Sequence, residues 1–219
     1  MLRRQLLKSA AAIAAAAATG ISFGRAALAA NPTMTTVCKI VGVPYFSILG
    51  AGLEEAGKKV GIDSNMIGPA QVDPAQQVRL VEDVIAKKVN VLGLIPLDVK
   101  VLAPVVKRAR DAGIIVITQE GPDMDGRTWD VEMVDSTAFG EAMMKSLAKQ
   151  IGEEGDYICI VGTLTTPLHN LWCDAAIAYQ KANYPKMTLV ADRFPGADQI
   201  DTTEQVVRDA LQAYPKLKG

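Results

Sequence analysis

Hydrophobic and polar positions follow two rhythms along this chain: short continuous apolar runs, and longer stretches with an apolar residue every three or four positions. Runs of the first kind are typical of strands buried on both faces, and stretches of the second kind are typical of helices with one buried face. The apolar runs cover residues 37–43, 91–95 and 114–118, with weaker ones at 62–68 and 131–134. Their alternation with helical stretches predicts an α/β fold whose parallel sheet is covered by helices.

Capping residues mark the expected helix boundaries. Asp73 precedes Pro74 and Gln76, a combination typical of a helix N-terminus with a capping box. Asp98 is placed to cap the next helix. A first helix is expected over residues 47–60, where Gly61 ends it, and a later helix is expected to end at Gly152. These boundaries support the α/β assignment.

The pattern restarts after a polar stretch at residues 152–156. It predicts a strand at 157–161, a helix at 170–183, a strand at 187–194 and a last helix that Asp201 opens, with Glu204 completing a capping box. We therefore expect an N-terminal α/β lobe over residues 30–152 and a partial C-terminal α/β lobe over residues 153–219.

The first 29 residues have the order of an export signal. Arg3 and Arg4 give a basic start, residues 10–21 form an uncharged apolar run, and residues 27–29 supply a cleavage pattern of small residues. The apolar run is too short to span a membrane, so residues 1–29 are interpreted as a signal peptide. Residues 3–8 resemble a twin-arginine signal, and an ordinary secretory signal with two arginines explains them equally well. Either route places the protein outside the cytoplasm.

Composition removes several classes of function. The net charge is -1 and the pI is near 5.9, so no affinity for nucleic acid or an anionic membrane surface is expected. A single histidine argues against a histidine-based zinc site. The three cysteines are Cys38, Cys159 and Cys173, without C-x-x-C spacing. Cys38 and Cys159 lie in apolar runs where cysteine is usually a small core residue, so we expect no disulfide.

Phosphate-binding glycine loops are missing from the sequence. Neither G-x-G-x-x-G nor G-x-x-x-x-G-K-[ST] occurs. The turn after the first predicted strand carries Tyr45 and Phe46, whose rings keep backbone amides away from a pyrophosphate. We therefore expect no catalytic residues, no metal and no cofactor.

Polar and aromatic side chains follow the predicted strands, at the carboxyl edge where parallel sheets bind ligands. The candidate ligand-binding residues are Lys39, Tyr45, Phe46, Asp98, Glu120, His169, Asn170 and Trp172. Rings suit the C–H faces of a sugar, and carboxylates, amides and imidazole suit its hydroxyls.

Several of these candidates also have a purely structural interpretation. Asp98 suits a helix cap, Glu120 a solvated loop and Trp172 core packing. Lys39 interrupts an apolar strand, where an unpaired charge is costly, so a functional role is favoured there.

Five stretches form a pattern in their order and spacing: K-I-V-G-V-P-Y-F at 39–46, G-P-A at 68–70 followed by Q-Q at 76–77, I-P-L-D at 95–98, T-Q-E-G at 118–121 and H-N-L-W-C-D at 169–174. Together they resemble periplasmic sugar-binding proteins of ABC transporters, the type I, ribose-binding-like class. The resemblance is greatest to the branch with autoinducer-2- and rhamnose-binding proteins. It covers residue 35 to the last residue.

The resemblance implies two Rossmann-like lobes with parallel sheets that close on a sugar-like ligand without transforming it. It implies ligand contacts from Lys39, an aromatic ring at Tyr45 or Phe46, Asp98, Glu120 and the turn at 169–170. The implied partner is the permease of an ABC importer, and we expect a monomer. The alternative from the residues alone is an exported α/β enzyme such as an oxidoreductase, which the missing glycine loops disfavour.

The sequence departs from this pattern in three ways. Autoinducer-2 binders carry an Asp-Gln pair where Leu168 and His169 stand, and Asp where Glu120 stands, so the sequence predicts another sugar at least as readily as autoinducer-2. The sequence also ends after a helix where another strand is expected. The second lobe is therefore expected to be incomplete, and the sequence is expected to be either a fragment or a C-terminally truncated gene product.

Overall fold

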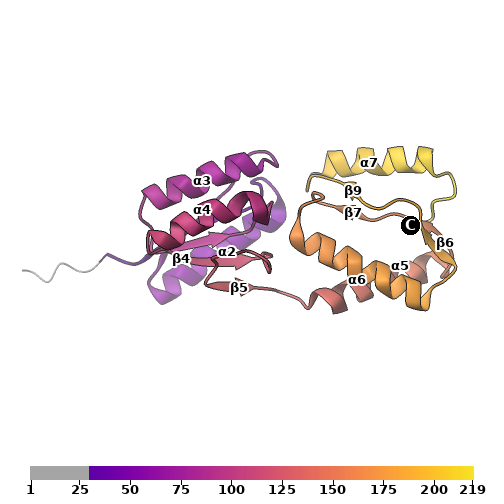
Figure 1. Ribbon diagram of the computed structural model, residues 1–219, viewed down its shortest axis with the longest axis horizontal. Coiled ribbons are helices and arrows are strands. Elements are labelled where there is room, and N and C mark those ends of the chain that lie inside the picture. Colours follow the sequence, from indigo (N-terminus) through magenta and orange to yellow (C-terminus); the bar gives the residue numbers. More distant parts are fainter. Residues whose placement is uncertain (1–29) are drawn as a thin grey trace, which may run out of the picture. The chain divides into compact units, whose positions relative to one another are not determined.

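The computed structural model describes residues 30–219, so the export signal predicted for residues 1–29 lies outside the described residues. Strands and helices alternate from the first strand to the fourth, and each later helix is preceded by two successive strands (Figure 1). The first elements are β1 (Thr33–Val37), α2 (Pro44–Val60), β2 (Asp63–Ile67), α3 (Pro74–Ala86), β3 (Val91–Leu94), α4 (Val99–Asp111), β4 (Ile115–Gln119) and β5 (Trp129–Val131). They continue with α5 (Ser136–Ile151), β6 (Gly155–Tyr157), β7 (Ile160–Val161), α6 (Pro167–Asn183), β8 (Met187–Leu189), β9 (Phe194–Pro195) and α7 (Ile200–Ala213).

The first five strands form one parallel sheet in the order β2-β1-β3-β4-β5. Val37 of β1 is in register with Ile67 of β2 on one side and with Leu94 of β3 on the other. The predicted parallel α/β architecture is confirmed. The strand predicted at 131–134 is wrong in its bounds, because β5 spans 129–131. Its partner β4 ends at Gln119, since Glu120 takes a left-handed backbone with φ 57° that leaves the ladder.

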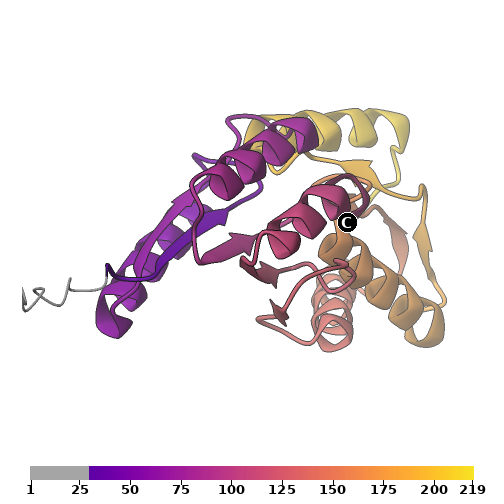
Figure 2. The same cartoon turned by 60° about the vertical axis from the view of Figure 1, so that its left-hand side comes forward.

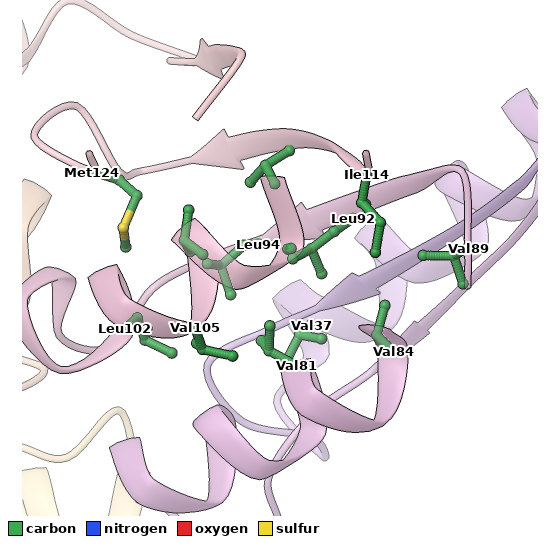
Figure 3. Packing of buried hydrophobic residues seen from close by; sticks show 13 residues of the cluster. Val37, Val81, Val84, Val89, Leu92, Leu94, Leu102, Val105, Ile114 and Met124 are labelled. Carbon is green, nitrogen blue, oxygen red and sulfur yellow. The ribbon is translucent and has the colours of Figure 1, made fainter. Parts of the chain in front are cut away.

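The core of this sheet lies between its strands and the helices α3 and α4 (Figure 3). Leu92 and Leu94 of β3 pack against Val81 of α3 and against Leu102 and Val105 of α4. All of these side chains are fully buried. The apolar run at 91–95 is therefore a buried strand, as the hydrophobic pattern indicates. In the run at 114–118, β4 buries Val116 and Thr118 and leaves Ile115 exposed, so only one of its faces is fully buried.

Side-chain caps explain where α3 and α4 begin. Asp73 accepts hydrogen bonds from the N–H groups of Ala75 and Gln76, and Asp98 caps α4 in the same way. Both predicted caps are confirmed. The predicted start of α2 at residue 47 is wrong, because Pro44 occupies the first turn and Ser47 N already donates to Val43 O.

The capping box predicted at Asp201 and Glu204 is also wrong. The cap residue of α7 is Gln199, whose carbonyl accepts from Thr203 N at 2.9 Å. That bond closes the first helical turn, so Asp201 already lies inside the helix.

Each strand predicted in the C-terminal part is divided in two. Residues 157–161 and 187–194 form the parallel pairs β6-β8 and β7-β9. Between β8 and β9, the four residues 190–193 lie opposite the two residues 158–159. The hydrogen-bond ladder is therefore interrupted between Leu189 and Phe194. Leu217 forms a parallel bridge with Asp156 on the other side of β6.

Helices α5 and α6 pack side by side, as Figure 2 also shows. Gly140 allows this contact, because a Cβ atom there would lie 2.4 Å from Trp172 O and 2.7 Å from Ala175 Cβ. Met144 and Ala148 of α5 share a buried cluster with Tyr157. Helix α5 thus packs with elements that follow it in the sequence, and the lobe boundary at residue 152 stays a prediction.

None of the helices in residues 30–219 has the length and hydropathy that crossing a membrane requires.

Candidate ligand-binding site

A cavity of about 280 Å³ lies at the carboxyl ends of β1 and β4. Its lining comes from the loop after β1, the start of α2, the loop after β4, the start of α6 and the turn before α7: Lys39, Val43, Tyr45, Phe46, Glu120, His169, Trp172 and Asp198. A larger hollow of about 510 Å³ lies at the amino ends of β1 and β2, around Thr33 and Asp63. We place the site in the smaller cavity, because it combines aromatic and charged groups at the edge where parallel sheets bind ligands.

A buried ion pair forms one wall of the cavity. Lys39 Nζ lies 2.5 Å from Glu120 Oε2, and the two side chains are 2% and 12% exposed. The cationic side chain extends from the loop after β1, and the carboxylate stands directly after β4. The positive charge of Lys39 is therefore paired with an opposite charge, which offsets part of the cost of burying it.

Aromatic rings form another wall. The Trp172 ring stacks on the His169 ring at 5.3 Å between centroids, with 24° between the planes. The Trp172 ring also contacts the ring of Phe139 on α5, with 4.7 Å between the ring centroids. The Tyr45 and Phe46 rings meet edge to face at 5.2 Å. These ring positions provide the flat apolar surfaces that the C–H faces of a sugar require.

His169 is held as a neutral imidazole. Its Nδ1 accepts a hydrogen bond from Gly162 N at 2.9 Å, so the ring proton resides on Nε2. Burial lowers the pKa of His169, and the charge of Lys39 lowers it further. Asp198 Oδ1 lies 4.0 Å from Nδ1, too far for a hydrogen bond. His169 Nε2 is therefore a hydrogen-bond donor.

Two polar atoms of the site have no hydrogen-bond partner within residues 30–219. They are Trp172 Nε1, a donor, and Asp198 Oδ2, an acceptor, and both are buried. Buried polar atoms normally have partners. A bound molecule with hydroxyl groups is able to satisfy both.

The side chains that line the cavity carry a small net negative charge. Lys39 and Glu120 compensate each other, His169 is neutral, and the carboxylate of Asp198 remains. The described residues hold no cluster of three or more side chains suited to a metal ion. The arrangement is suited to binding a small, uncharged, hydroxylated molecule.

Residues 35–219 match the family described as periplasmic binding protein domain. The chain is a member of this family. It is 34% identical over 91 residues to the D-ribose/D-allose-binding protein of Pseudomonas aeruginosa, a match that spans 40% of this chain and 28% of that protein. It is 25% identical over 193 residues to the ribose import binding protein of Escherichia coli, a match that spans 87% of this chain and 63% of that protein.

A solved structure carries the same fold as this periplasmic binding protein domain. It is an ABC transporter solute-binding protein from Clostridium phytofermentas with bound L-rhamnose, at a TM-score of 0.80 and 21% identity. The match covers 84% of this chain and 58% of that protein. The chain thus spans less than two thirds of the length of each of these three relatives.

Six of the eight predicted site residues line the cavity of this periplasmic binding protein domain: Lys39, Tyr45, Phe46, Glu120, His169 and Trp172. The other two, Asp98 and Asn170, are not among its lining residues. Asp98 caps α4 through Oδ1. Asn170 Oδ1 accepts from Arg193 at 2.6 Å, and its Nδ2 donates to Thr166 O at 2.7 Å. The ligand-contact roles of these two residues stay predictions.

Three residues that matter here were missed in the sequence. Asp198 and Val43 line the cavity. Arg193 ties Asn170 and Asp174 together from the loop between β8 and β9. Asp198 lies four residues after the predicted strand at 187–194. Because ligands bind at the carboxyl ends of parallel strands, the sequence also offered Asp198 as a candidate.

Gln77 belongs to the Q-Q pair of the family resemblance, and its side chain stabilises the backbone beside the candidate site. The side chain is fully buried. Its Nε2 donates to Cys38 O and Ile95 O, and its Oε1 accepts from Leu97 N at 2.9 Å. These bonds join the segment after β1 to the segment after β3, which fixes the backbone next to Lys39.

Proposed function

We propose that this protein is the receptor of an ABC importer and that it binds a neutral monosaccharide in the cavity without transforming it. The observation that carries the proposal is the buried Lys39–Glu120 pair beside the stacked rings of His169 and Trp172. Fixed charges and flat rings at one small cavity are typical of sites that hold a polyhydroxylated ring.

The hydrogen-bonding groups of the cavity complement such a ligand. His169 Nε2 and Trp172 Nε1 are donors, and the carboxylates of Glu120 and Asp198 are acceptors. A hydroxyl group both donates and accepts, so several hydroxyls on one sugar are able to meet all of these groups. Removing one such buried partner costs about 1–3 kcal/mol of binding free energy.

The charge of the cavity favours an uncharged sugar over a sugar phosphate or sugar acid. Lys39 is already paired with Glu120, so it offers no free positive charge. An anionic ligand would also approach the carboxylate of Asp198, which lies in the same cavity. Like charges at short range disfavour binding.

The relatives support a receptor rather than the exported oxidoreductase that the sequence left as the alternative. Those with curated names are binding proteins for ribose, or for ribose and allose. One solved neighbour holds L-rhamnose, and another, at 23% identity, is described in complex with autoinducer-2. Within this range we propose a pentose or deoxyhexose, because His169 and Glu120 depart from the autoinducer-2 pattern.

Location and assembly follow from the same proposal. The signal at residues 1–29 delivers the protein to the periplasm by the twin-arginine or the general secretory route. There the protein acts as a monomer and presents its ligand to a permease. Two lobes, over residues 30–152 and 153–219, contribute to the ligand site.

Calorimetric titration of the full chain with ribose, allose, arabinose, rhamnose and ribose 5-phosphate tests this function. We expect saturable binding of at least one neutral sugar, and binding of the phosphate weaker by about 100-fold or more. Asp198→Asn is expected to weaken binding about tenfold, and Asp125→Asn, at an exposed turn position, serves as the matched control. Binding of no neutral sugar, or tighter binding of the phosphate, contradicts the proposal.

A further inference from the structure

Glu120 takes an unusual backbone conformation for a residue that carries a side chain. Its φ is 57°, in the left-handed region that residues other than glycine rarely adopt. Such a conformation persists where the surrounding structure holds it in place, and it is often found at binding sites. Glu120 also carries the carboxylate that pairs with Lys39 in the candidate site. The contacts that hold this turn therefore decide where the carboxylate lies.

Asp130 of β5 holds the turn on both sides of Glu120. Its Oδ1 accepts a hydrogen bond from Thr118 Oγ1 at 2.5 Å and a longer one from Gly121 N at 3.3 Å. Thr118 is fully buried and is in register with Asp130 in the ladder between β4 and β5. The Thr118 hydroxyl also lies 3.4 Å from Trp129 O, but its single proton serves the closer, charged acceptor. One carboxylate oxygen thus holds residues that precede and follow Glu120.

The neighbouring residues leave this turn little freedom. A Cβ atom on Gly121 would lie 3.1 Å from Pro96 Cγ, so the backbone is packed closely there. One position before Glu120, Gln119 Nε2 donates a hydrogen bond to Tyr45 OH at 2.7 Å. The turn therefore meets the cavity at two points, the Glu120 carboxylate and the Tyr45 ring, and both of these residues line it.

We propose that Asp130 is a positioning residue of the ligand site, which fixes the turn at residues 118–121 and thereby holds the Glu120 carboxylate against Lys39. Asp130 itself is not among the residues that line the cavity, so its contacts reach a ligand through Glu120. The inference deepens the proposed function and rests on it for the ligand. Sequence reasoning missed this role, because the strand predicted at 131–134 begins after Asp130 and the pairing with Thr118 depends on the register of β4 and β5.

A purely structural role for Asp130 would be to stabilise the pair of strands β4 and β5. Thr128 provides a matched comparison, because it joins the same two strands closer to their amino ends. Its Oγ1 accepts hydrogen bonds from Arg110 Nη1 at 2.7 Å and from Val116 N at 3.3 Å. Thr128→Val removes these bonds and nearly keeps the shape of the side chain. It should therefore lower the midpoint of thermal unfolding without moving Glu120.

The first measurement is calorimetric titration of the full chain with ribose, allose, arabinose and rhamnose. Asp130→Ala removes both hydrogen bonds to the turn, so the Kd of the bound sugar should rise about tenfold or more. Asp130→Asn keeps an acceptor oxygen at the same position, and its Kd should change by less than about threefold. Thr118→Val deletes the stronger bond from the donor side and should raise the Kd by at least about threefold. Thr128→Val should leave the Kd within about twofold of the wild-type value.

The second measurement needs no sugar. Heteronuclear NMR of side-chain ammonium groups detects a lysine that is buried and paired, and the loss of one signal in Lys39→Arg assigns that signal to Lys39. In Asp130→Ala and in Thr118→Val the signal should shift or broaden, because the Glu120 carboxylate is no longer held against the ammonium group. Asp130→Asn and Thr128→Val should keep the wild-type signal. A role confined to stabilising the strand pair does not predict this difference.

Two outcomes overturn the proposal. One is an equal loss of affinity in Asp130→Ala and Thr128→Val, and the other is an unchanged Lys39 signal in Asp130→Ala and Thr118→Val. If Asp130→Ala does not fold, Thr118→Val decides both measurements. If the wild-type protein binds none of the sugars, the proposed function is contradicted, while the Lys39 signal still shows whether Asp130 positions Glu120, so the two failures are distinguishable.

Discussion

Lys39 and Glu120 lie 81 positions apart in the sequence, and their charged groups meet at 2.5 Å in the interior. Because removal of one partner leaves an unpaired buried charge, we expect Lys39→Met to lower the free energy of unfolding by about 3–5 kcal/mol. Urea unfolding followed by circular dichroism measures this loss.

The double variant Lys39→Met/Glu120→Leu separates stability from binding. It removes both charges, so most of the lost stability should return while sugar affinity does not. The matched control is Lys107→Met, which breaks the exposed Lys107–Asp111 pair on α4 and should change stability by less than about 1 kcal/mol. A double variant as unstable as the single one would refute the pairing argument.

His169 makes stability depend on pH in a defined direction. Burial and Lys39 lower its pKa in the folded protein below the ordinary value of 6.5. Between the folded and unfolded pKa values the unfolded state binds more protons, so stability rises with pH there. The contribution is complete above pH 6.5 and is lost as the pH falls through the folded pKa. Urea midpoints measured from about pH 8 to about pH 5 should decrease accordingly.

The variant His169→Asn serves as the control for that titration. Its side-chain oxygen is able to accept the hydrogen bond from Gly162 N, but it does not titrate. The wild-type curve should fall more steeply below pH 6.5 than the variant curve. Parallel curves for the two proteins would mean that His169 does not contribute.

Gly140 and Gly52 give a matched pair of substitutions in helices. Gly140→Ala places a Cβ atom against Trp172 O, so it should push α6 from α5, cost about 1–3 kcal/mol and shift the tryptophan fluorescence. Gly52→Ala meets no atom within 4 Å and should stabilise α2 by up to about 1 kcal/mol. Equal effects of the two substitutions would show that α5 and α6 do not pack this closely.

Helix α7 is held by few buried groups. Ala210 is its buried residue, whereas Leu102, Val105, Val106 and Ala109 are all buried in α4. Ile200 and Leu211 of α7 are exposed. We expect the amides of α7 to exchange with solvent well before those of α4 in a hydrogen-exchange time course. Slow exchange throughout α7 would contradict this expectation.

Predictions from local evidence succeeded at the caps of α3 and α4 and failed at the starts of α2 and α7. Asp73 and Asp98 cap helices because a short acceptor side chain reaches the first free N–H groups of its own helix. The apolar runs at 91–95 and 114–118 became strands β3 and β4 of the parallel sheet, whereas the run at 37–43 shares only Val37 with β1. Predictions failed where a partner strand decided the result, as at residues 190–193, which interrupt two strands that look continuous in the sequence.

The candidate site divides in the same way. The sequence by itself determined the parallel α/β class, the strand ends that carry the candidate ligand-binding groups, and six of the residues that line the cavity. Only the tertiary structure paired Lys39 with Glu120, stacked Trp172 on His169 and added Asp198 to the cavity. Hydrophobic period and helix capping act over a few residues and leave a pattern in the sequence, whereas contacts between distant segments depend on how strands and helices pack.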